Sequence, residues 1–236
     1  MGRALWELVL RDMRVIARDR LLLAFAVLII PAALYLSRAS EAGPEAVGVG
    51  AAAVAVGCGV LVSGLRWRDA ESGYLSSLLV FPIDRSTLAL ATAVSAGVIS
   101  GTASAVVCGT VSGAWGLSVR HGIGACWYVA IGAGAVAMLI AAAAGRVRGD
   151  GFPWAAGLVG LAMLVPVTDS AHRYGGAVLR WLLWLDPAWA TASVVRLGVS
   201  ATGQESDIPS LAVLIGMWVC GAAACTRSLR SVRGAT

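Results

Sequence analysis

The chain has 236 residues, of which 58% are hydrophobic and 13% charged, and its formal net charge at pH 7 is +5. Soluble domains carry about 25% charged residues, so this composition excludes a soluble globular protein and indicates an all-α polytopic membrane protein. All 18 basic residues are arginine. Because a P-loop needs a lysine to reach the nucleotide phosphates, a conventional ATP site is also excluded. Any ATP-driven work would need a separate polypeptide.

Two further ligand classes are not expected. The arginines are spread over polar segments between apolar stretches and form no continuous basic stripe, which argues against nucleic-acid binding. The two histidines are isolated in short polar breaks, and the five cysteines lie inside or at the ends of apolar stretches. Such cysteines act mainly as small packing residues. No metal site or cofactor site is therefore expected in this chain.

Residues 1–20 are predicted to form an amphipathic helix that lies in the membrane interface. At about 100° per residue, apolar and basic side chains fall on opposite faces, an arrangement typical of helices that bury one side in lipid. The alternative is an ordinary juxtamembrane positive patch. A signal peptide is the alternative for the first apolar stretch, Leu21–Ser37, but residues 1–20 are too long and too mixed in charge for its n-region. The apolar face holds Trp6, Val9, Met13 and Ile16, and the basic face holds Arg11, Arg14 and Arg18.

Six apolar stretches are predicted to cross the membrane within residues 21–226. About 20 apolar residues span a bilayer as a helix. Thirteen of the arginines fall on one side of this arrangement and five on the other, so the positive-inside rule places both termini, including the tail 227–236, in the cytoplasm. We therefore expect a multi-pass protein of the plasma (cytoplasmic) membrane. The predicted spans are Leu21–Ser37, Ala46–Leu65, Leu88–Trp115, Ile123–Ala144, Pro153–Thr168 and Ile208–Thr226.

A cytoplasmic coupling helix is predicted at residues 69–80, between spans two and three. Asp69 and Glu71 stand near its start, where acids favour the helix dipole, and Pro82 ends it. A short helix that displays both charge and leucine suits the docking of a soluble partner. The residues expected to couple this chain to that partner are Asp69, Glu71, Gly73, Leu75, Leu78, Leu79 and Pro82.

An outer re-entrant hairpin is predicted at residues 174–199, between spans five and six. Asp186 and Pro187 stand in the order of an N-cap and a first helical residue, and tryptophans such as Trp189 suit the membrane boundary. The alternative is a seventh span over Ala177–Val199. Its charged residues, among them Arg196, argue against that alternative, and it would also place the termini on opposite sides.

Two stretches resemble the ABC type-2 exporter permeases. In "ESGYLSSLLVFPIDRSTLAL" an acid, a glycine, a leucine-rich helix and a proline precede the third span, although the family's usual threonine-leucine-glutamate after the glycine is replaced by Tyr74, Leu75 and Ser76. In "WLDPAWATASVVR" a proline leads to an aromatic residue and an arginine, as it does before the family's last span. The matching residues are Glu71, Gly73, Leu75, Leu78, Leu79, Pro82, Arg85 and Ser86, then Asp186, Pro187, Trp189 and Arg196.

The resemblance implies a transport subunit rather than an enzyme. A separate ATPase subunit would bind ATP and Mg²⁺ and dock on the coupling helix. A second permease subunit, identical or a related paralogue, would complete the translocation path. The cargo would be amphipathic, namely a drug, an antibiotic, a lipid or a peptide. The alternative within the class is a haem-exporter permease of cytochrome c maturation, which has a similar length and a comparable segment before its third span.

A membrane enzyme or a channel is the alternative outside this class. Intramembrane chemistry needs ionisable residues within the spans, and the six predicted spans hold no aspartate, glutamate, histidine or arginine between their ends. The hydroxyls of the third span, Ser95, Ser100, Thr102 and Ser104, are candidates for lining a substrate path. Small residues of this kind also serve close helix packing, so both roles remain open from the sequence.

Overall fold

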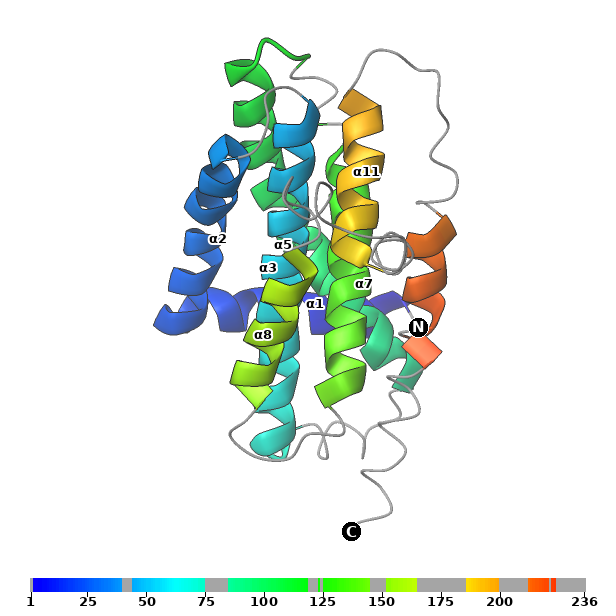
Figure 1. Cartoon of the computed structure of the whole chain (residues 1–236). Helices are drawn as coiled ribbons and strands as arrows, with labels where there is room; N and C mark the ends of the chain where they lie inside the picture. The colour runs from blue at the N-terminus through cyan, green and yellow to red at the C-terminus, as the bar shows by residue number, and fades with distance from the viewer. Residues whose placement is uncertain are drawn as a thin grey trace.

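The computed structural model describes residues 2–39, 44–74, 85–118, 123, 125–144, 152–164, 186–199, 212–220 and 222–223. Throughout these ranges the regular structure is α-helical, as the apolar composition predicts. Long helices stand side by side in a bundle, and one N-terminal helix runs across them (Figure 1).

Three helices are long and apolar enough to cross a membrane, which makes this a membrane protein. They are α2 (Arg20–Ala39), α3 (Pro44–Glu71) and α5 (Arg85–Ala114). Each covers one of the first three predicted spans, and α3 extends six residues beyond the predicted end at Leu65. Of the most apolar 18-residue window, 89% is buried in α3 but only 17% in α2. Thus α3 is the centre of the bundle, while most of α2 faces outward.

The last three predicted spans correspond to shorter helices. These are α7 (Cys126–Ala144), α8 (Phe152–Leu164) and a helix at 212–220. The apolar part of α7, Cys126–Ala141, is shorter than each of the three long helices, and α8 has 13 residues. Six complete crossings therefore stay a prediction, and the chain's orientation in the membrane stays one as well.

Small side chains allow α3 and α7 to pack closely. A Cβ atom added to Gly59 would lie 2.8 Å from Cβ of Val136 on α7, and the amide of Ala137 would lie 3.1 Å away. Only a residue without a side chain fits such a crossing, which is how membrane helices gain close van der Waals contact. The neighbouring Ser63 adds a hydrogen bond from its hydroxyl to the carbonyl oxygen of Ala137 at 3.3 Å.

The N-terminal helix α1 (Gly2–Arg18) crosses the long helices and packs against α5 and α2 (Figure 1). Its amphipathic character agrees with the sequence, but the apolar face does not lie in lipid along its whole length. Val9 and Ile16, both expected to face lipid, are buried against the bundle, whereas Trp6 is 54% exposed. The reason is that the long helices present an apolar surface to α1. Part of the apolar face of α1 packs on that surface, and the remaining part is left for the membrane.

The helix α11 (Pro187–Val199) lies within the bundle against α3, α7 and α8. The outer re-entrant hairpin stays a prediction, and within its second arm Ala188, Ala192 and Val195 are fully buried. Gly48 of α3 explains the close approach, because a Cβ atom there would lie 3.0 Å from the carbonyl oxygen of Ala192. The other arm of the predicted hairpin, 174–185, lies outside the described residues.

Candidate functional site

The end of α3 differs from the predicted start of a coupling helix. Asp69 and Glu71 belong to the last turn of α3, which continues past the predicted span because its final residues pair with α1. The turn closes with hydrogen bonds from Ser72 N to Arg68 O at 3.0 Å and from Gly73 N to Ala70 O at 3.3 Å. Gly73 adopts a φ of 71°, a left-handed conformation that favours glycine at a helix C-terminus.

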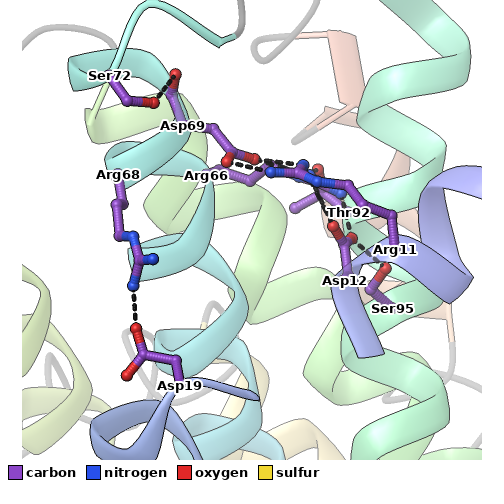
Figure 2. Close-up of polar contacts among 9 residues, drawn as sticks. All are labelled: Arg11, Asp12, Asp19, Arg66, Arg68, Asp69, Ser72, Thr92 and Ser95. Carbon is purple, nitrogen blue, oxygen red and sulfur yellow. Dashed lines mark hydrogen bonds and ion pairs between the residues drawn. The ribbon is translucent and has the colours of Figure 1, made fainter. Parts of the chain in front are cut away.

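A buried ion pair joins α1 to α3 beside this end. The two terminal guanidinium nitrogens of Arg66, Nη1 and Nη2, each donate to the carboxylate of Asp12, Nη1 at 3.1 Å. Arg66 Nε donates to Thr92 Oγ1 at 2.9 Å, and the Ser95 hydroxyl donates to Asp12 at 2.6 Å. Side chains of α1, α3 and α5 thus meet at this bidentate ion pair, as Figure 2 shows. The pairing satisfies both ions where water does not reach, since Asp12 is completely buried and Arg66 is 6% exposed.

A second pair extends the same network. Arg11 donates to both carboxylate oxygens of Asp69 (Figure 2), and Arg66 reaches Asp69 at 3.3 Å. The guanidinium of Arg11 also lies 4.2 Å from the ring centroid of Tyr74, a cation–π contact. We refer to Arg11, Asp12, Arg66 and Asp69 as the charge cluster. It alternates two cations with two anions, so its members neutralise one another.

The corner between α1 and α2 is fastened to α3 by a separate pair. Arg68 forms an ion pair with Asp19 (Figure 2), and Asp19 also accepts hydrogen bonds from the amides of Leu21 and Leu22 at the start of α2, at 3.0 and 3.3 Å. The hydrogen bond from Arg68 and the two amides hold the pKa of Asp19 below its ordinary value. Asp19 therefore caps α2 and links it to α3.

The charge cluster and its hydrogen bonds to Thr92 and Ser95 hold α1, α3 and α5 together. Burial raises the pKa of Asp12, while the charge of Arg66 and the hydrogen bond from Ser95 oppose that rise. Removing one partner of a buried ion pair costs about 3–5 kcal/mol, because the other charge is left uncompensated. These contacts therefore hold the end of α3 to both α1 and α5.

The predicted coupling residues are divided by the structure. Asp69 belongs to the charge cluster and is only 5% exposed, so its carboxylate is not available to a partner protein. Glu71 and Gly73 are exposed at the α3 end. The others, Leu75, Leu78, Leu79 and Pro82, lie outside the described residues.

The predicted residues of the outer hairpin come together along α11. Asp186 caps the helix, with its Oδ1 accepting from the amide of Ala188 at 2.9 Å, and Pro187 is the first helical residue, as the sequence predicts. Arg196 pairs with Glu45 of α3 at 2.9 Å and lies 4.8 Å from the ring centroid of Trp189.

The predicted path-lining residues do not share one surface. Ser95, Ser100 and Ser104 are completely buried, and the hydroxyls of Ser100 and Ser104 donate to backbone carbonyl oxygens one turn earlier in α5. This favours the packing role that the sequence left open. Among the four, Thr102 lines the apolar groove of about 750 Å³ that the described residues form between α5, α7 and the helix at 212–220, and the other three do not.

Sequence reasoning missed most of the charge cluster. Asp12 was not singled out, and Arg11 was assigned to the lipid head groups. A signal was present, since Asp12 lies at i+4 from Leu8 and i−4 from Ile16, both of them buried. An acid within the apolar stripe of an amphipathic helix requires a buried cation.

Comparison with known proteins gives no assignment: no family model matches this chain, and no curated protein does so. Within the described ranges, no group of three or more histidine, cysteine, aspartate or glutamate side chains is placed to hold a metal ion. The charge cluster is thus defined by its geometry alone, as a polar joint at one end of an apolar bundle.

Proposed function

We propose that this chain is the transmembrane permease subunit of an ATP-binding-cassette exporter. It moves an amphipathic cargo (a drug, an antibiotic, a lipid or a peptide) outward with energy from a separate ATPase subunit. The proposal rests on the resemblance of residues 71–90 and 184–196 to the type-2 exporter permeases, and on the lack of any lysine for a P-loop. The bundle consists of six crossings with both termini in the cytoplasm, and two such subunits form the path.

The charge cluster is the observation that carries the mechanical part of the proposal. An ATPase that pushes on the segment after α3 needs a stiff connection to the helices that move. The α3 end is tied to α1 through Arg11 and Asp69, and to α1 and α5 through Arg66 and its partners Asp12 and Thr92. The joint adjoins the segment 71–90 that carries the family resemblance.

The exposed end of α3 is the contact surface for the ATPase in this account. Glu71, Ser72 and Gly73 are exposed, and Tyr74 is 40% exposed beside Arg11. ATP binding closes the ATPase dimer and shifts this end. The shift biases the bundle between inward-open and outward-open states, because the docked ATPase contacts the two states differently.

The test is reconstitution with an ATPase subunit that carries Walker motifs and is encoded beside this chain. Both are co-expressed, purified through a tag on this chain and placed in proteoliposomes, where ATP hydrolysis is measured. The proposal predicts that the ATPase subunit co-purifies and that hydrolysis depends on this chain. A chain that turns over a substrate alone, or one that leaves hydrolysis by the ATPase unchanged, contradicts it.

A pair of substitutions separates docking from folding. Glu71→Arg alters the exposed end of α3 without touching the charge cluster, so it should lower ATPase stimulation while membrane insertion is kept. Glu7→Arg is the matched control on α1: its carboxylate is exposed and, among the described residues, pairs with the exposed Arg3 at 3.0 Å. Equal ATPase stimulation in the two variants removes the α3 end from the proposed contact.

A further inference from the structure

Asp186 places a carboxyl group inside the bundle at the start of α11. The residue is 9% exposed. Its Oδ1 accepts the capping hydrogen bond from the amide of Ala188. Its Oδ2 is buried and has no hydrogen-bond partner among the described residues. One oxygen of this group thus has a structural role, and the other has none.

Asp186 lies well inside the length of the bundle. Arg196 pairs with Glu45 at the beginning of α3, and Asp186 precedes Arg196 by ten residues, which is about 15 Å along a helix axis. Ala188, two residues after Asp186, belongs to an apolar cluster that also includes Val56, near the middle of α3. The carboxyl group therefore lies beside the apolar part of α3.

Among the described residues, the elements packed against α11 offer Asp186 no counter-charge; the segment 165–185, which directly precedes Asp186, lies outside these residues. The packed elements are α3, α7, α8 and the helix at 212–220. Of their titratable groups, α7 holds only Cys126 and Tyr128, the helix at 212–220 holds only Cys220, and α8 holds none. The charged groups of α3 are Glu45, which pairs with Arg196 of α11, and those at its far end: Arg66, Arg68, Asp69 and Glu71.

A carboxylate in this position would be costly. Taking an ionised carboxylate out of water without a partner costs far more than burying a neutral polar group, and desolvation of this kind favours the protonated form. An ionisable residue at membrane depth is a candidate functional site for the same reason. The chemical form that fits this apolar surrounding is the neutral acid, with its proton on Oδ2.

We propose that Asp186 is a proton-binding site within the bundle, occupied while α11 is packed against α3 and α7. When this packing opens, the O–H bond on Oδ2 breaks, the electron pair stays on the oxygen and the proton passes to water. Repacking takes one proton back. This inference is independent of the transport role. The proton is then a ligand of the bundle whose binding depends on whether α11 is packed against α3 and α7.

Infrared spectroscopy of the full chain in lipid nanodiscs tests the site directly. A protonated carboxyl absorbs at a frequency separate from that of carboxylates and shifts in D₂O. The wild type should keep this band at about pH 7, where an ordinary aspartate, with a pKa of about 3.9, is ionised. Asp186→Asn should lose the band, and Asp19→Asn, which alters a partly exposed carboxylate outside the bundle interior, should keep it. A wild type without the band, or an Asp186→Asn variant that retains it in full, overturns the proposal.

Thermal unfolding as a function of pH gives a second, independent reading. If the folded state binds the proton more tightly than the unfolded state, the wild type must lose stability relative to Asp186→Asn as the pH rises from about 4. An ionised Asp186, favoured by the helix dipole, would give the opposite slope, and that slope refutes the proposal. A wild-type melting temperature that rises with sodium at constant pH, with no such rise in the variant, replaces the proton by a cation and also refutes it. If Asp186→Asn does not fold, Asp186→Ser, which keeps an oxygen that can cap α11, replaces it in both measurements.

Discussion

Asp12 of α1 and Arg66 of α3 form a buried ion pair, although 54 positions separate them in the chain. The pair fixes the angle at which the N-terminal helix crosses the bundle. Ser95 and Thr92 of α5 complete its hydrogen bonds. An amphipathic helix that could have rested on the membrane alone is thereby made part of the bundle.

Replacing Asp12 by alanine should destabilise the protein by about 3–5 kcal/mol, because Arg66 is left buried without its main partner. Denaturant unfolding in detergent micelles, followed by tryptophan fluorescence, measures the change. Glu7→Ala on the same helix removes the exposed pair with Arg3 and should cost no more than about 1 kcal/mol. An equal decrease in the free energy of unfolding in the two variants would mean that the buried pair stabilises the protein no more than the exposed pair does.

Reversing the charge of Asp69 should damage folding as well as coupling. Asp69→Arg would set a third guanidinium against Arg11 and Arg66, with Asp12 as the remaining anion. We expect poor membrane yield and early proteolysis of α1. The second-site change Arg11→Asp should recover yield by restoring an opposite charge. A normally folded Asp69→Arg protein would contradict the cluster's role in fastening α1.

Gly73→Ala should cost about 1–2 kcal/mol, because its φ of 71° is unfavourable for a residue with a Cβ atom. Gly101→Ala in α5 is the matched control. A Cβ atom there meets nothing within 4 Å, so the change should be neutral or gain about 0.5–1 kcal/mol of helix stability. Unfolding midpoints of the two variants give the comparison. A Gly73→Ala midpoint at or above that of the wild type would show that the turn does not need the left-handed conformation.

Gly132→Ala should weaken the contact between α7 and α11. An added Cβ atom would overlap Thr191 Oγ1 and lie 3.0 Å from both of that residue's side-chain carbons. Overpacking of this kind costs about 1–3 kcal/mol. The double variant Gly132→Ala, Thr191→Ala removes the overlapping atoms and should recover part of the loss. An effect of Gly132→Ala that Thr191→Ala leaves unchanged would place the strain elsewhere.

The Asp19 corner should loosen in acid. Hydrogen bonds from Arg68, Leu22 and Leu21 lower the pKa of Asp19 in the folded protein. A group whose pKa is lower in the folded protein stabilises the fold at pH values above its pKa in the unfolded chain, about 3.9 for aspartate. This stabilisation is lost as the pH falls through the pKa of Asp19 in the folded protein. Hydrogen exchange at the amides of Leu21 and Leu22 should therefore gain protection between acid and neutral pH, beyond the change in intrinsic rate. Asp19→Asn should remove this gain, and a variant that keeps it would exclude the carboxylate as its source.

The apolar framework could be predicted from the sequence because hydropathy is a local property. The starts of α2, α3 and α5 fall within three residues of the predicted spans. The capping role of Asp186 was also readable, since an N-cap depends only on the residues that follow it. Likewise, α1 forms where its apolar periodicity predicts a helix.

The contacts between helices could not be predicted, because they join distant parts of the chain. No local pattern pairs Asp12 with Arg66. The burial of α11 follows from glycines on other helices, among them Gly48 and Gly132. The tryptophans of the predicted hairpin indicated a position at the membrane boundary. The alanines of the same segment, which pack against α3, are instead typical of close packing between helices.

The most direct test of the central claim is ATP hydrolysis by the neighbouring ATPase subunit in proteoliposomes, with this chain wild type or carrying Glu71→Arg. The account predicts hydrolysis that requires this chain and falls in the variant while the amount of inserted protein stays the same. Hydrolysis that is indifferent to the presence of this chain would contradict the account.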